Sequence, residues 1–127
     1  MKSNTPNVLL VDDSSTNNLL LESALKRLNF KIFTALSGEE ALTVLKKKEI
    51  DLVLLDIMMP GMSGYDVLET MAKNEKLKKI PVILVTARNQ HEEEARAKEL
   101  GVTDFFEKPL KLNLLIDRIN ELIHFNE

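Results

Sequence analysis

The chain has 127 residues, of which 44% are hydrophobic and 29% are charged, the balance of a globular domain that buries its own core. It contains no cysteine, which excludes disulfides, zinc–thiolate sites and thiol nucleophiles. A net charge of −3 argues against a bare nucleic-acid-binding surface, and the apolar runs are too short to span a bilayer. We therefore expect a cytoplasmic protein with no signal peptide, no membrane segment and no direct contact with nucleic acid.

Five short apolar runs alternate with segments of helical spacing. The runs are Val8 to Val11, Phe30 to Ala35, Leu52 to Leu55, Val82 to Val85, and Phe105 with Phe106. Three of them are continuous rather than alternating, which is typical of strands covered on both faces of a parallel sheet. The repeated alternation predicts an α/β fold in which a single five-stranded parallel sheet is doubly wound by five helices.

The first helix is expected from about Ser15 to Leu28, with one apolar face. The members of that face are Leu20, Leu21, Ala24, Leu25 and Leu28. Capping-box spacing marks the starts of the second and third helices, at Ser37 and at Ser63.

A fourth helix is expected from Asn89 to Leu100, ended by Gly101. Its few apolar residues predict one of the looser elements of the fold. The fifth helix ends near His124, so we expect residues 1–127 to form one domain with a core of about 7–124.

Polar side chains follow four of the strands. They are Asp12 and Asp13 after the first strand, Asp56 after the third, Thr86 after the fourth, and Lys108 after the fifth. Because the carboxyl ends of parallel strands lie at one edge of the sheet, these groups are expected to converge. Taken singly, Asp12 and Asp13 could equally be turn formers or helix caps. The five groups together indicate a site.

Three neighbouring carboxylates repel one another, so a positive charge must lie among them. Mg²⁺, a hard cation that binds oxygen, fits this requirement, and together with Lys108 it balances the three carboxylates. Such a site is suited to an anionic phosphoryl group, whose charge Mg²⁺, Lys108 and Thr86 would stabilise. Asp56 ends the central strand and is the expected nucleophile, forming an aspartyl phosphate.

These motifs resemble the receiver domain of two-component response regulators. The matching segments are LLVDD ending at Asp13, LLDIMMPGMSG starting at Leu54, VTA ending at Ala87, and EKP ending at Pro109. The resemblance covers nearly everything from Asn7 to His124. It implies a flavodoxin-like, CheY-like fold with strand order 2-1-3-4-5.

The resemblance also implies roles for the acidic residues. Asp56 would be the phosphoacceptor. Asp13 and Asp56 would bind Mg²⁺ directly, and Asp12 would act largely through water. The backbone carbonyl of Met58 would be a further metal ligand.

On the other side of the site, the resemblance implies that Thr86 hydrogen-bonds the phosphoryl group and that Lys108 forms an ion pair with it. The Lys108–Pro109 bond would be cis, and Ala87 would be small so that the donor can approach. The switch aromatic is often Tyr, but here it is Phe105, which has no hydroxyl. Phe105 is therefore either a switch coupled to Thr86 or a core side chain that does not move.

The partners implied are a sensor histidine kinase or a phosphotransfer protein, and an unidentified output protein. Phosphorylation is expected to draw Thr86 toward Asp56, repack the fourth helix and fifth strand, and switch the face that these form with the fifth helix. A homodimer could form through the same face. Leu19, near Glu22, is either a kinase-docking residue or an ordinary exposed leucine. The domain would be a switch and not an enzyme, although it assists its own phosphorylation and dephosphorylation.

Three alternatives remain open. Aspartate-nucleophile phosphohydrolases need a second Asp two residues after the nucleophile, and here that residue is Met58. A flavodoxin-like FMN binder would need a phosphate-binding loop after the first strand, where this chain has an acidic pair. The chain could also be a receiver cut from a hybrid kinase or a longer regulator. His91 and His124 are not placed to carry phosphate.

Overall fold

The structure, a computed structural model, describes residues 5–86 and 91–125, and within these the side chains of residues 5–86 and 95–123. The elements in chain order are β1 (Asn7–Val11), α1 (Ser15–Lys26), β2 (Lys31–Ala35), α2 (Gly38–Lys47), β3 (Leu52–Asp56), α3 (Gly64–Ala72), η1 (Leu77–Lys79), β4 (Val82–Thr86), α4 (His91–Glu99), β5 (Asp104–Glu107) and α5 (Leu112–Phe125). The predicted alternation of strands and helices is confirmed. The short 3₁₀ turn η1 was not predicted.

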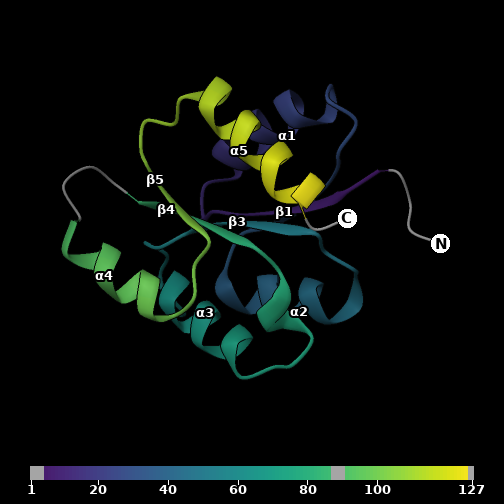
Figure 1. The fold of residues 1–127 in the computed structure, drawn as a ribbon. Coiled ribbons are helices and arrows are strands. Elements are labelled where there is room, and N and C mark those ends of the chain that lie inside the picture. Colours follow the sequence, from purple (N-terminus) through teal and green to yellow (C-terminus); the bar gives the residue numbers. More distant parts are fainter. Residues whose placement is uncertain (1–4, 87–90, 126–127) are drawn as a thin grey trace.

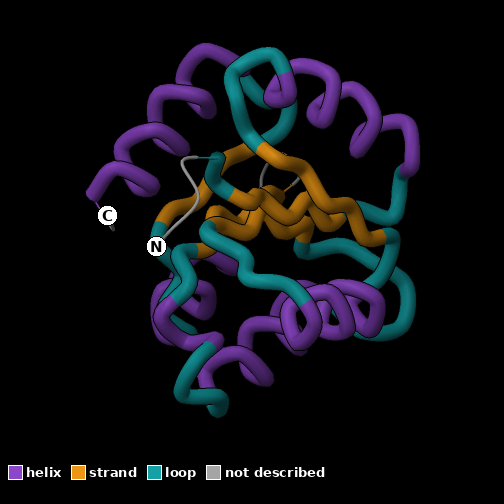
Figure 2. The backbone as a smooth tube through the Cα atoms, turned by 90° about the vertical axis from the view of Figure 1, so that its right-hand side faces the viewer, coloured by secondary structure: helices purple, strands orange, loops and turns teal. Residues whose placement is uncertain are grey.

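The five strands form one parallel sheet in the order β2-β1-β3-β4-β5. Helices α1 and α5 cover one face of the sheet, and α2, α3 and α4 cover the other (Figure 1). The view in Figure 2 shows the sheet lying between these two helical layers. The strand order implied by the family resemblance is therefore confirmed, and β3 lies at the centre of the sheet.

Alternation along each strand divides the core between the two faces. Leu9, Val53 and Leu84 belong to the cluster under α2 and α3. Val8 and Leu54 pack on the opposite side, in the cluster that includes residues of α1 and α5. Every residue of β3 and β4 is buried, which explains why these strands have no polar alternation in the sequence.

Helix α1 corrects part of the sequence-based prediction, because it ends at Lys26 and buries a narrower face than expected. Leu25 is fully buried, but Leu20 is 66% exposed and Leu28 is 44% exposed. Leu28 lies past the end of the helix, in the turn before Asn29, which has a φ of 68°. Leu20 lies on the wall of a cavity at the carboxyl edge of the sheet.

The predicted helix starts at Ser37 and Ser63 are confirmed, and each side chain accepts a hydrogen bond from the first turn of its helix. Ser63 forms a complete capping box with Asp66. Gly101 follows α4 with a φ of 85°, a conformation that suits a residue without a Cβ. The predicted start of α4 at Asn89 lies outside the described residues. Within the described ranges, no helix has the length and apolar character required to cross a membrane.

Gly64 brings the start of α3 into contact with the end of β3. A Cβ atom at Gly64 would lie 2.5 Å from the backbone oxygen of Asp56 and 2.9 Å from the Cα of Ile57. Neither backbone atom can move without displacing the strand. We therefore predict that Gly64→Ala lowers the free energy of unfolding by about 1–3 kcal/mol, measured by urea denaturation.

Gly38→Ala is the matched control for this prediction. A Cβ atom there would also come close to its neighbours, but these are the flexible side-chain atoms of Met62, at 2.7–2.9 Å. Because a methionine side chain can move aside, Gly38→Ala should cost less stability than Gly64→Ala. Equal losses for the two variants would contradict the role of the Asp56 backbone in this contact.

Candidate functional site

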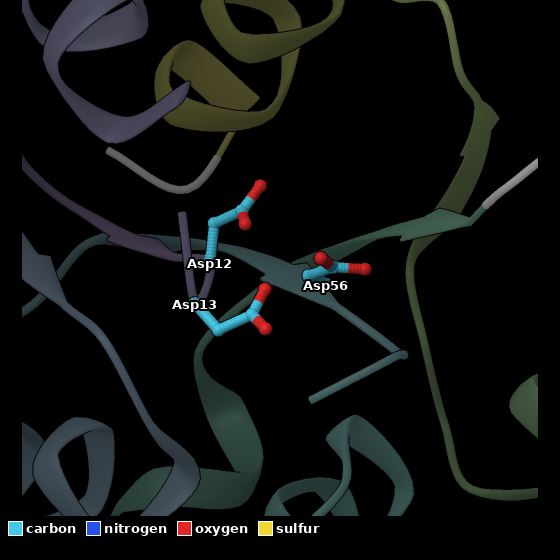
Figure 3. Close-up of side chains that lie close together, drawn as sticks. All are labelled: Asp12, Asp13 and Asp56. Atoms are coloured by element: carbon cyan, nitrogen blue, oxygen red, sulfur yellow. The ribbon is translucent and has the colours of Figure 1, made fainter. Parts of the chain in front are cut away.

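The three acidic residues predicted to converge lie together at the carboxyl edge of the sheet. Asp12 and Asp13 follow β1, and Asp56 ends β3, as Figure 3 shows. Each residue offers a carboxylate oxygen, and these oxygens lie within 4.8 Å of one another. Asp12 and Asp56 are buried, whereas Asp13 is exposed. The site is thus a cluster of negative charge, open to solvent on the side of Asp13.

Lys108 bridges two of these carboxylates. Its Nζ atom lies 3.4 Å from Oδ2 of Asp12 and 3.3 Å from Oδ2 of Asp56. The lysine is held at the sheet edge because its backbone N–H donates to the carbonyl of Thr86 at 2.8 Å. The Lys108–Pro109 peptide bond is cis. The ammonium group therefore joins the end of β5 to the ends of β1 and β3.

Asp56 is positioned by both neighbours along the chain and neighbours across the sheet. It pairs in register with Val85 of β4. Its Oδ1 atom accepts a hydrogen bond from the backbone N–H of Met58 at 3.2 Å, while Oδ2 faces Lys108. The Met58 side chain is exposed. Both carboxylate oxygens of Asp56 thus have a donor, one from the backbone and one from an ammonium group.

Burial and neighbouring charges both shift the pKa values of Asp56 and Lys108. Burial raises the pKa of Asp56 above its ordinary value, and the charge of Asp12 adds to this, while Lys108 and the N–H of Met58 only partly offset the rise. For Lys108, burial lowers the pKa, but the charges of Asp56 and Asp12 outweigh it and the net shift is upward. Burial is thus the largest cause of the shift at Asp56, whereas at Lys108 the two carboxylates together outweigh burial.

The donor set suits a magnesium ion. Hard divalent cations prefer carboxylate oxygens, and Mg²⁺ takes one or two of them together with water and phosphate oxygens. One ammonium among three carboxylates leaves the cluster two positive charges short, which is the charge of Mg²⁺. The residues present therefore fit the metal predicted from the sequence.

The predicted switch residues lie on the neighbouring strands. Thr86 ends β4 and is 1% exposed. Phe105, on β5, is partly buried and packs against the core cluster on the α2, α3 and α4 side. Phe106 packs against the opposite cluster. Ala87 lies outside the described residues, as do the side chains of His91 and His124.

The first turn of α1 holds Asp12 in place, a role that was not predicted from the sequence. The backbone N–H of Ser14 donates to Oδ1 of Asp12 at 2.9 Å, and Nδ2 of Asn17 donates to Oδ2 at 3.3 Å. Asn18 is buried beneath this turn. The sequence feature that could have indicated this role is the run of short polar residues after Asp13, because such side chains often form hydrogen bonds to nearby backbone groups.

A cavity of about 600 Å³ adjoins the acidic cluster on the α1 and α5 side of the sheet. Asp12, Asp56 and Lys108 lie at its polar end. Its remaining wall is mainly apolar and includes Leu20 and Leu110. The site is therefore continuous with a hollow that α1 and the loop after β5 enclose.

Residues 8–120 match the family model of the response regulator receiver domain. The chain belongs to this family. This receiver domain is 30% identical over 116 residues to protein PilH of Pseudomonas aeruginosa, a match that covers 91% of the chain and 96% of PilH. It is also 41% identical over 113 residues to a probable cyclic di-GMP phosphodiesterase of Vibrio cholerae, covering 89% of the chain. The recognition of a receiver domain from its motifs is thereby confirmed.

Solved structures agree with this assignment. The receiver domain of a signal transduction histidine kinase from Syntrophus aciditrophicus is 30% identical, with a TM-score of 0.88 over 94% of this chain and 91% of that one. The chemotaxis protein CheY4 of Vibrio cholerae is 25% identical, with a TM-score of 0.87 over 93% of this chain and 98% of that one. The predicted CheY-like fold is confirmed.

The receiver domain spans only part of several curated relatives. It covers 25% of the length of the Vibrio cholerae phosphodiesterase and 53% of transcriptional regulatory protein AfsQ1 of Streptomyces coelicolor. Relatives of this family therefore include proteins in which the matched region is one part of a longer chain.

The burial of Asp56 beside the charge of Asp12 yields a prediction about stability. In metal-free buffer at pH 7, Asp56→Asn should unfold at a higher temperature than the wild type, by about 4 °C for each 1 kcal/mol of relieved burial and repulsion. Because the pKa of Asp56 is higher in the folded state than in the unfolded state, ionisation destabilises the fold as pH rises between these two values. The advantage of the variant should therefore be complete above the folded-state pKa and shrink as the pH falls below it. Thermal melts at several pH values measure this.

The control is Asp117→Asn, which removes an exposed carboxylate from α5. It should show no comparable gain at pH 7. A wild type that is more stable than Asp56→Asn at pH 7 without metal would mean that the ion pair with Lys108 outweighs burial and repulsion.

Proposed function

We propose that the domain accepts a phosphoryl group on Asp56 in the presence of Mg²⁺ and acts as a switch in a two-component phosphorelay. The observation that carries this proposal is the setting of Asp56. It is a buried carboxylate at the end of the central strand, 3.3 Å from the ammonium of Lys108 and clustered with Asp12 and Asp13. A nucleophile of this kind needs neighbouring positive charge as the anionic phosphoryl group arrives.

The step is a transfer of a phosphoryl group between two side chains. A carboxylate oxygen of Asp56 forms a bond to phosphorus, the P–N bond to the donor histidine breaks, and the departing imidazole takes up a proton. Lys108 forms an ion pair with the transferred group, and the hydroxyl of Thr86 donates a hydrogen bond to it. When bound, Mg²⁺ supplies a Lewis acid that stabilises negative charge on the phosphoryl oxygens.

The metal-binding roles follow the position of each residue. Asp13 and Asp56 would bind Mg²⁺ directly, and the backbone carbonyl of Met58 would be a further ligand. Asp12 would act largely through water, which agrees with the fact that both of its carboxylate oxygens already accept hydrogen bonds from Ser14 and Asn17. Exposed Asp13 leaves the site accessible to the ion.

The donor is a sensor histidine kinase or a phosphotransfer protein that docks across α1. Leu19 is 61% exposed and, with Glu22, lines a groove between α1 and the segment that runs from β2 into α2. Leu20 is also exposed and lines the cavity beside Asp56. Leu20 beside the proposed phosphoacceptor, and Leu19 next to it in the chain, give a partner an apolar surface to cover.

The output is a change at the face formed by α4, β5 and α5. Within the described part of α4, Ala97 is fully buried, while Arg96 lies on the surface, 4.5 Å above the ring of Tyr65 and 3.3 Å from Glu69 of α3. Such contacts are weak individually, so α4 is a suitable element to shift. Movement of Thr86 toward the phosphoryl group would be transmitted through Phe105 on β5 to this face, where an output protein or a second copy of the chain would bind.

The matched relatives leave two settings for this switch. Residues 1–127 would form one domain of a cytoplasmic protein that works alone, or they would be the receiver module of a hybrid kinase or longer regulator. The same chemistry at Asp56 serves both settings, and the domain acts as a switch rather than as a catalyst with an external substrate.

Phosphorylation by acetyl phosphate tests the central proposal. The wild type should gain one phosphoryl group in the presence of Mg²⁺, detected by mass spectrometry of the intact protein. Asp56→Asn should gain none, and excess chelator should abolish the gain because the metal is needed to neutralise the developing charge. The matched variant Asp117→Asn should behave as the wild type does. Label retained by Asp56→Asn, or equal labelling in chelator, would overturn the proposal.

The switch proposal is tested separately by hydrogen exchange. With a phosphoryl mimic and Mg²⁺ bound, amide exchange should change in α4 and β5, while the buried strands β1 and β3 remain protected. Exchange by mass spectrometry, with and without the mimic, measures this difference. Identical exchange of α4 in both states would contradict the proposed route to the output face and leave the chemistry at Asp56 intact.

A further inference from the structure

Asn18 is a polar residue on the sheet-facing side of α1. It is the fourth residue of the helix and only 3% exposed. Asparagine is a poor helix former, and a buried amide is costly unless its hydrogen bonds are made. The reason for an amide here must therefore lie in its tertiary contacts.

The Nδ2 group of Asn18 donates two hydrogen bonds. One goes to the backbone carbonyl of Asp12 and the other to the carbonyl of Ala35, both at 3.1 Å. The carbonyl of Ala35 also accepts the backbone N–H of Asp12 at 3.2 Å. One amide thus joins α1 to the carboxyl ends of both β1 and β2.

The hydrogen bond to the Asp12 carbonyl acts on the Asp12–Asp13 corner, which is the turn directly after β1 that carries two of the acidic residues. The carbonyl of Asp12 belongs to the peptide group that connects Asp12 to Asp13. Holding this carbonyl fixes the plane of that peptide group, and the plane sets the direction in which the Asp13 side chain leaves the backbone. The carboxylate of Asp12 is held independently by Ser14 and Asn17. Asn18 therefore holds the backbone of the Asp12–Asp13 corner, whereas Ser14 and Asn17 hold the Asp12 carboxylate.

The second polar atom of the amide, Oδ1, shows that these two hydrogen bonds come with a desolvation cost. Among the described residues, Oδ1 of Asn18 is buried and has no hydrogen-bond partner. An apolar side chain of similar size would avoid that desolvation cost, but it would leave the carbonyl of Asp12 without this donor. The two donated bonds are the feature that distinguishes asparagine from leucine at this position.

We propose that Asn18 is a positioning residue that orients the Asp12–Asp13 corner for Mg²⁺ and thereby supports phosphorylation of Asp56. This inference rests on the proposed function. Asn18 itself touches neither the metal nor the phosphoryl group. Residues that orient metal ligands through such hydrogen bonds change metal affinity when they are replaced.

Titration of the full chain with Mg²⁺ alone, followed by calorimetry, tests the inference. Asn18→Leu removes both donated bonds and keeps the branched shape of the side chain, so the dissociation constant for Mg²⁺ should rise about tenfold. The matched control is Asn74→Ala, which also removes two bonds between an asparagine side chain and the backbone, to Lys76 and Leu77 beyond the far end of α3. It should leave the Mg²⁺ affinity unchanged even if it lowers the melting temperature.

The outcomes separate this inference from the proposed function. If Asn18→Leu lowers the melting temperature but binds Mg²⁺ as the wild type does, Asn18 is merely structural and the inference is wrong. If Asn18→Leu does not fold, Asn18→Ala removes the same bonds without adding branched bulk, and the same tenfold weakening is expected of it. A wild type that neither binds Mg²⁺ nor takes up phosphate from acetyl phosphate would instead refute the proposed function.

Discussion

The candidate site depends on the concentration of negative charge at one edge of the sheet. Asp12 and Asp56 are both buried, and Asp13 lies beside them with an oxygen within 4.8 Å. Lys108 pairs with two of the three carboxylates and cannot neutralise the cluster alone. A fold that maximised stability would not collect these charges in one place. The arrangement is explained if the missing positive charge comes from outside, as a divalent cation that binds together with a phosphoryl group.

The parallel sheet makes this concentration possible. Every parallel strand ends at the same edge, so one polar residue at the end of each strand is enough to build a site from segments far apart in the chain. Full burial of β3 and β4 by helices on both faces then fixes where those ends lie. Gly64 contributes by letting α3 begin directly against the backbone of Asp56. The rigidity of the sheet thus positions the acidic cluster, and the loops that follow the strands leave it open to solvent.

Much of this arrangement could be predicted from the sequence because it depends on local patterns. Continuous apolar runs located the central strands to within a residue or two, and Ser37 and Ser63 marked helix starts through capping, which is a short-range interaction. The prediction failed where burial depends on what the rest of the chain covers. Leu20 and Leu28 have helical spacing, but nothing in the spacing shows that Leu20 faces an open cavity or that the helix ends before Leu28.

The role of Asn18 was missed for a related reason. In the sequence it is one of several short polar residues that open a helix, and such residues usually cap or face solvent. Its two backbone partners are supplied by different strands, and Ala35 lies 17 positions away. Only the parallel pairing of β1 with β2 brings the carbonyls of Asp12 and Ala35 within reach of one amide. The local sequence pattern therefore identified the carboxylates but not the residue that orients the peptide group between Asp12 and Asp13.

Lys108 shows how the same constraint can connect the chemistry to a switch. Its ammonium is shared between Asp12 and Asp56, and its backbone N–H is bonded to the carbonyl of Thr86. A phosphoryl group on Asp56 would carry more charge than the carboxylate that it replaces and would attract Lys108 away from Asp12. Because Thr86 ends β4 and Lys108 directly follows β5, that attraction would act where β4 leads toward α4 and where β5 leads toward α5. If Asp56 is phosphorylated as proposed, the shortage of positive charge around it would therefore also be a physical reason for the fold to respond at the proposed output face.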